Sequence, residues 1–203
     1  MEDYGKLHNE MIIAIMKNAK ISADMTIEQK KEAFLQGYVD TYGEENVELV
    51  KQGISFNSPF EVIDSVKDKM SSELHAFLKV DIDYLLKNDN VNYEEYLNKR
   101  ISEAELSENE LQFYKDYSSI LTGSVELWSS EQGMGYIDLL DTTPEVEGKR
   151  PPTREQVIGY IGVQDWVGGF FGGLVGGPIG VAAGAVGASA SATISHLFYS
   201  QYN

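Results

Sequence analysis

Residues 167–192 read VGGFFGGLVGGPIGVAAGAVGASASA, and small residues recur in this stretch with a regular spacing. One small residue stands at every fourth position; the series is Gly168, Gly172, Gly176, Gly180, Gly184, Ala188 and Ala192. Positions four apart lie on one face of an α-helix, so the series forms a flat surface onto which another helix can pack closely. This pattern is a glycine zipper. It predicts a C-terminal helix, or a helical hairpin, suited to close helix packing.

The zipper segment needs a partner to be helical. Nine glycines lie between Trp166 and Ser195, and each costs a helix in water about 1 kcal/mol relative to alanine. No formally charged residue occurs in this stretch, which is long enough for a tilted membrane span. Gly177 and Pro178 predict a hinge, which would bend the segment into a hairpin. Lipid or protein must therefore enclose the tail, and the sequence leaves open both a membrane span and burial in a soluble core.

The tail resembles the glycine-zipper segments of bacterial membrane-active proteins, which include bacteriocin-like peptides and pore-forming effectors. The resemblance rests on the series from Gly168 to Gly184 and its extension through Ala188 and Ala192. It is confined to the tail, and the spacing is more specific for close helix packing than for toxicity. The resemblance implies that the tail inserts into membrane lipid or self-associates into a homo-oligomer.

The preceding part of the chain, residues 1–128, has the pattern of an acidic helical body. Apolar residues recur at helical spacing in five segments, near residues 7–16, 26–43, 58–86, 93–106 and 108–128. Helix-capping residues begin two of them: Ser58 precedes Pro59, and Ser107 stands three positions before Glu110. No run of residues alternates as a β-strand would. We therefore predict an all-α protein, a helical bundle with five helices in its body.

Residues 129–154 are predicted to link this body to the tail, residues 155–203. The range contains three glycines and three prolines, which favour turns and loops. The charge pattern also changes here. All 16 Lys and Arg residues lie at or before Arg154, and after Gln156 the only formally charged side chain is Asp165.

The composition restricts the partners and the cellular route. The chain has 32 acidic and 16 basic residues and a net charge of −16, which disfavours nucleic acid and would suit a cationic protein partner. There is no cysteine, so disulfides and thiolate chemistry are excluded. The apolar run Met11–Met16 ends at Lys17 and is too short for a Sec signal. We expect cytoplasmic synthesis, followed by membrane association or by export through a dedicated exporter.

No pattern of residues indicates an enzyme. His8, His75 and His196 do not lie at spacings typical of metal ligands, so no metal site and no cofactor are expected. We interpret His8 and His75 as half-exposed helix histidines. Acidic pairs such as Asp81 and Asp83 are interpreted as solvated charge.

Two hypotheses of different classes remain. In the first, the protein is membrane-active, and its acidic body keeps the zipper soluble until the tail enters a bilayer. In the second, it is a non-enzymatic soluble interaction or structural protein whose glycine-rich tail is buried in its core or in a subunit interface. Both hypotheses predict that Gly176→Leu is more damaging than Gly162→Leu, because Gly162 stands outside the four-residue series.

Overall fold

The protein is built from α-helices. The computed structural model describes residues 3–88, 91–141 and 151–194, and these ranges contain helices and no strand. The helices are α1 (Tyr4–Asn18), α2 (Ile27–Tyr42), α3 (Val47–Ser55), α4 (Pro59–Ser65), α5 (Ser72–Lys87), α6 (Tyr93–Glu103), α7 (Glu108–Ser129), α8 (Glu131–Leu140) and α9 (Arg154–Ile194), with a 3-10 turn η1 at Lys67–Lys69. The all-α prediction is confirmed.

Side-chain caps explain where several helices begin. The predicted capping box of α7 is present, with Ser107 and Glu110 each bonded to the other's backbone N–H. Ser58 caps α4, which has Pro59 at its first position, as the sequence indicated. Ser71 caps α5 by accepting a hydrogen bond from the backbone N–H of Leu74. Each such cap contributes about 1 kcal/mol to helix stability.

The prediction of five helices in the body was wrong in two places. The segment near 58–86 is divided into α4, η1 and α5, because Ser71 starts a new helix that apolar periodicity alone does not reveal. Helix α3 was missed, and its Gly53 is a packing position. Helix α8 lies inside the predicted linker, where its N-cap Ser130 accepts a hydrogen bond from the backbone N–H of Gly133. Residues 142–150 of that linker lie outside the described residues.

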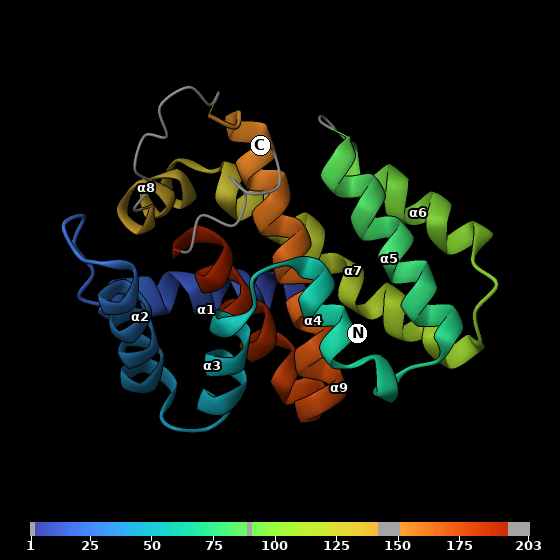
Figure 1. The fold of residues 1–203 in the computed structure, drawn as a ribbon, viewed down its shortest axis with the longest axis horizontal. Coiled ribbons are helices and arrows are strands. Elements are labelled where there is room, and N and C mark those ends of the chain that lie inside the picture. The colour runs from blue at the N-terminus through green and yellow to red at the C-terminus, as the bar shows by residue number, and fades with distance from the viewer. Residues whose placement is uncertain (1–2, 89–90, 142–150, 195–203) are drawn as a thin grey trace.

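Helix α9 is a hairpin and occupies the centre of the molecule (Figure 1). Its backbone leaves the helical conformation at Gly177, and Pro178 follows, so the chain has a first arm (residues 154–176) and a second arm (residues 178–194). Helices α3 and α7 supply its most extensive packing, and α1, α2, α4 and α5 also contact it. The hairpin belongs to the same hydrophobic core as the helices of the body.

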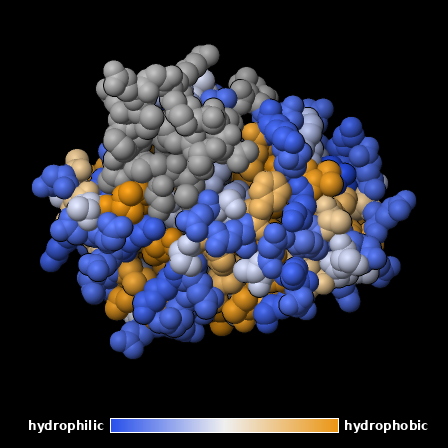
Figure 2. All heavy atoms as spheres, viewed as in Figure 1, coloured by the Kyte–Doolittle hydropathy of each residue, from blue (hydrophilic) through white to orange (hydrophobic). Residues whose placement is uncertain are grey.

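The second arm is enclosed over almost its whole length. Every residue from Gly180 to Ile194 is buried, whereas the turn of the hairpin is exposed. The exposed apolar side chains at this turn include Val175, 42% exposed, and Ile179, 69% exposed. Hydrophobic surface is visible in Figure 2 at the lower edge of the molecule, where the turn of α9 lies in Figure 1. A buried apolar hairpin thus reaches solvent at its tip.

Candidate functional site

The zipper residues of the two arms face each other. A Cβ atom added to Gly168 would lie 2.5 Å from the Cβ of Ala188, and one added to Gly172 or Gly184 would collide with backbone of the opposite arm. Gly180 likewise meets the backbone oxygen of Gly172. The flat surface expected from the sequence therefore packs against the chain's own second arm. Ala192 is buried farther along that arm.

Gly176 does not belong to this contact between the arms. It is exposed, and a Cβ there would meet the end of the Leu49 side chain of α3, which can move aside. Gly162, by contrast, is buried against Val125 and Leu121 of α7. The structure therefore favours the opposite of the expected order of damage. Gly162→Leu should destabilise the protein more than Gly176→Leu.

Further glycines bring the hairpin close to the body. Gly169 and Gly173, each of which follows a residue of the zipper series, face Ile120 and Tyr117 of α7. On the second arm, Gly187 meets the backbone of α3 at Gly53. The small residues thus serve three interfaces: arm with arm, first arm with α7, and second arm with α3.

The hinge lies at Gly177 and Pro178. Gly177 has φ 66° and ψ −163°, a conformation that essentially only glycine adopts without strain. A proline immediately after it removes a helical hydrogen-bond donor. These two residues end the first arm and let the second arm turn back along it.

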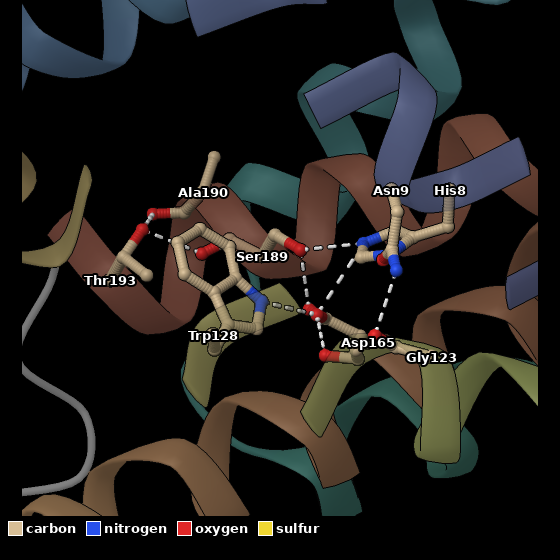
Figure 3. A network of polar contacts seen from close by, with 9 residues as sticks. His8, Asn9, Gly123, Trp128, Asp165, Ser189, Ala190 and Thr193 are labelled. Carbon is tan, nitrogen blue, oxygen red and sulfur yellow. Dashed lines mark hydrogen bonds and ion pairs between the residues drawn. The ribbon is translucent and has the colours of Figure 1, made fainter. Parts of the chain in front are cut away.

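A fully buried polar cluster joins the hairpin to the body (Figure 3). At its centre is Asp165 of the first arm. Its Oδ2 accepts hydrogen bonds from the Ser124 hydroxyl at 2.5 Å and the Trp128 indole N–H at 3.1 Å, both on α7. Its Oδ1 accepts a hydrogen bond from the Ser189 hydroxyl of the second arm at 2.6 Å. The Nε2 atom of His8, on α1, lies 3.4 Å from Oδ2 of Asp165, so four segments meet at one carboxylate.

Both ring nitrogens of His8 have polar partners in the core. Asn9 donates its amide N–H to the carbonyl oxygen of Gly123 at 2.8 Å, which directs its own oxygen toward His8 Nδ1 at 3.0 Å. Because the Ser189 hydroxyl donates to Asp165, its oxygen is an acceptor for His8 Nε2 at 2.9 Å. Both ring nitrogens of His8 therefore lie within hydrogen-bond distance of an oxygen atom. His8 and Asp165 are in direct contact in the core.

Burial is the main influence on the Asp165 carboxyl. Removal from water raises its pKa above the ordinary value, while the nearby His8 and the hydrogen bonds from Ser124, Ser189 and Trp128 act in the opposite direction. Desolvating two charges costs free energy that their attraction repays only when the remaining polar atoms are also satisfied. Asp165 has such partners, so both of its carboxyl oxygens are hydrogen-bonded in the core.

Two polar side chains beside Asp165 are not satisfied. Within the described residues, neither the amide nitrogen nor the amide oxygen of Gln164 has a hydrogen-bond partner, and the same is true of Trp166 Nε1. Both side chains are fully buried. A buried polar group without a partner costs about 1–3 kcal/mol. Burial of these two side chains of the first arm therefore lowers the stability of the folded protein.

The cluster contains serine, histidine and aspartate, but its geometry is not that of a nucleophilic triad. In a triad, one imidazole nitrogen contacts the serine and the other contacts the carboxylate. Here Nε2 of His8 faces both Ser189 and Asp165, and all three side chains are closed to solvent. The described residues also contain no group of three or more potential metal ligands among His, Asp and Glu.

A second buried carboxylate joins helices of the body, and its partner Tyr114 also packs on Trp166 of the hairpin. Asp81 of α5 accepts hydrogen bonds from Tyr96 at 2.7 Å and Tyr114 at 2.8 Å and pairs with Arg100 of α6. Burial raises its pKa in spite of these partners. This cluster joins α5, α6 and α7.

Sequence reasoning missed both clusters. The interpretation of His8 as half-exposed and of Asp81 as solvated was wrong, because both side chains are fully buried. The one useful signal was that Asp165 stands alone as a charge in an apolar segment, which indicates a specific partner. The Nε2 atom of His75 lies 2.8 Å from Oδ1 of Asp64, and the side chain keeps some solvent exposure, in agreement with its interpretation as half-exposed. His196 lies outside the described residues.

Helix α9 is the one described helix that is long and apolar enough to cross a membrane, although the core helix of a soluble protein can meet the same criteria. Searches of protein-family models, curated proteins and solved structures found no match to this chain.

Proposed function

We propose that this is a membrane-active protein whose α9 hairpin leaves the acidic helical bundle and enters a lipid bilayer. The observation that carries the proposal is the combination of a buried, almost uncharged hairpin with an exposed apolar turn. The exposed Val175 and Ile179 give lipid a first point of contact without any unfolding. The first arm, at about 1.5 Å per residue, is long enough to cross a hydrocarbon core of about 30 Å.

The packing of the hairpin supports its transfer as a unit. The zipper contacts between Gly168, Gly172, Gly184 and Ala188 lie within the hairpin, so they can persist when its contacts with α3 and α7 are lost. Close packing of small residues stabilises helix pairs in lipid as well as in protein. The unsatisfied polar groups of Gln164 and Trp166 reduce the stability that has to be overcome on release.

Self-association would follow release. The glycine faces that meet α7 and α3 in the bundle would become free, and a second copy of the hairpin offers a matching surface. We therefore propose a homo-oligomer in the membrane. No catalytic step and no cofactor belong to this function.

The alternative is a soluble interaction or structural protein with the hairpin as its permanent core. The observation that favours it is the complete burial of the second arm from Gly180 to Ile194. In this case the acidic surface would bind a cationic protein partner, and the exposed turn would have no function in lipid.

Hydrogen exchange of the full chain, with and without vesicles, distinguishes the two functions. Membrane activity predicts that lipid at acidic pH increases exchange in α3 and α7, which lose their hairpin contacts, while the hairpin amides stay protected. A permanent core predicts that vesicles leave the exchange of α3, α7 and α9 unchanged at every pH. That second result would contradict the proposed membrane activity.

A further inference from the structure

Asp165 is the single formally charged side chain between Gln156 and Ile194. It is also the point at which the hairpin is most specifically bound to the rest of the molecule. The carboxylate contacts α1 through His8 and α7 through Ser124 and Trp128, and it joins the two arms through Ser189. If the hairpin enters lipid, this is the residue whose charge must be carried with it.

The groups that face Asp165 come from three directions. Helix α1 contributes His8, a titratable side chain that acts on the Asp165 carboxyl. Helix α7 contributes Ser124 and Trp128, and the second arm contributes Ser189, none of which titrates between neutral and acidic pH. The group of the hairpin that can bind a proton in this cluster is therefore the Asp165 carboxyl.

We propose that Asp165 is a proton-controlled latch, whose charge keeps the hairpin out of a lipid bilayer while it is ionised and lets the hairpin enter once it is protonated. The inference rests on the proposed membrane activity and adds its regulation. The step itself is the transfer of one proton from solvent to the Asp165 carboxylate.

Two interactions of the carboxyl and the charge of the hairpin change when this proton is bound. The carboxyl loses its charge and hence its electrostatic attraction to His8. One of its oxygens becomes a hydroxyl and can no longer accept hydrogen bonds as a carboxylate oxygen does from Ser124, Trp128 or Ser189. The hairpin then carries no formal charge between Gln156 and Ile194, so it enters hydrocarbon without an ion.

Acid alone is not expected to release the hairpin in water. Burial in the bundle raises the pKa of Asp165, so the folded state binds this proton more readily than the unfolded chain does. Protonation of Asp165 therefore favours the bundle over the unfolded chain. A bilayer excludes water and charge more completely than the bundle does, and there the carboxyl loses the hydrogen bonds from α7, so its pKa rises further on transfer into lipid. The latch consequently needs both acid and lipid.

Flotation with vesicles of phosphatidylcholine and phosphatidylglycerol tests the latch in the full chain. The partition coefficient is measured from neutral to acidic pH for the wild type, Asp165→Asn and Asp81→Asn. The last variant is the matched control, because Asp81 is another fully buried carboxylate with raised pKa, and its hydrogen bonds go to α6 and α7. Circular dichroism verifies that each variant is folded.

The latch predicts that the partition coefficient of the wild type rises as pH falls. Binding of a proton to Asp165 contributes to the slope of this dependence on pH. That proton accounts for up to about tenfold in the partition coefficient per pH unit. In Asp165→Asn the slope should fall by up to this amount and binding at neutral pH should rise, whereas Asp81→Asn should keep the wild-type slope. Equal slopes for the wild type and Asp165→Asn would overturn the latch and leave the membrane activity standing. No binding by either at any pH would overturn the membrane activity and the latch with it.

Ser189→Ala provides a second test if Asp165→Asn does not fold. It removes one hydrogen bond that favours the ionised carboxylate, so Asp165 should be protonated at higher pH and the midpoint of binding should move toward neutral. Ser191→Ala is its control, since the Ser191 hydroxyl is also buried on the second arm but donates to the carbonyl oxygen of Phe56. The same midpoint for both alanine variants would contradict the latch.

Discussion

His8 and Asp165 contact each other in the interior, with 3.4 Å between Nε2 and Oδ2 and no exposure of either side chain. The pair joins the first helix of the chain to the C-terminal hairpin. Because water cannot replace either partner there, the loss of one leaves the other as an unpaired buried group.

The energetic coupling of this pair can be measured with a double-mutant cycle. His8→Gln and Asp165→Asn are each expected to lower the free energy of unfolding by about 3–5 kcal/mol. The double variant should lose less than the sum, with a coupling of about 0.5–3 kcal/mol, because neither side chain then remains buried without its partner. Urea denaturation of the four proteins gives these values. Strictly additive losses would contradict an interaction between His8 and Asp165.

The pH dependence of folding stability should carry the signature of Asp165. Since burial raises its pKa, the native state holds this proton over a window above the ordinary Asp value of 3.8 in which the unfolded chain has released it. The contribution of Asp165 to stability is therefore fully present below that value and is lost as pH rises through the native pKa. Within the window, the free energy of unfolding of Asp165→Asn should fall less steeply with pH than that of the wild type, by at most about 1.4 kcal/mol per pH unit. Denaturation at a series of pH values measures both slopes, and equal steepness would contradict this account of the carboxyl.

Alanine substitutions separate the two roles of glycine in the hairpin. Gly172→Ala should cost about 1–3 kcal/mol, because its Cβ would collide with the backbone of Gly180. Gly177→Ala should also cost about 1–3 kcal/mol, for a different reason, since its φ of 66° and ψ of −163° suit glycine alone. Gly176→Ala is the control and should be neutral or gain up to about 1 kcal/mol from higher helix propensity. Thermal unfolding compares the three, and a Gly176→Ala variant as damaged as Gly172→Ala would show that the arms do not pack as described.

Gln164→Leu is expected to stabilise the protein. The substitution keeps a similar side-chain volume and removes two buried polar atoms that have no partner within the described residues. The gain should be about 1–3 kcal/mol. Gln156→Leu is a suitable control, because Gln156 lies at the start of the same helix, where its side chain accepts a hydrogen bond from the backbone N–H of Thr153. A loss of stability in Gln164→Leu would mean that the amide has a partner in solution.

Local sequence patterns were sufficient to predict the helical class and the bend at Gly177. These features follow from short-range rules, namely helical periodicity, capping by Ser58 and Ser107, and the conformations open to glycine and proline. The division of the long predicted helix at Ser71 was harder to predict from the sequence, because the apolar stripe continues across this residue.

The candidate site could not be predicted in the same way. His8, Ser124, Asp165 and Ser189 come from three helices that are far apart in sequence, and only tertiary packing brings them together. The zipper spacing indicated close packing but not its partner, so Gly176 was grouped with residues from which the structure separates it. One charge in a long apolar segment was the single local sign of the cluster.

Dye release from vesicles by two charge variants tests the membrane activity most directly. Ile179→Glu places a charge at the exposed turn of the hairpin, and Val80→Glu places one on α5, at a valine that is 58% exposed. Both positions face solvent, so both variants should retain stability within about 0.5 kcal/mol of the wild type. At acidic pH the wild type and Val80→Glu should release dye to the same extent, while Ile179→Glu should release it at least about tenfold more slowly, because its turn must carry a charge into hydrocarbon. Equal release by the two variants, or no release by the wild type at any pH, would contradict entry of the hairpin into the bilayer.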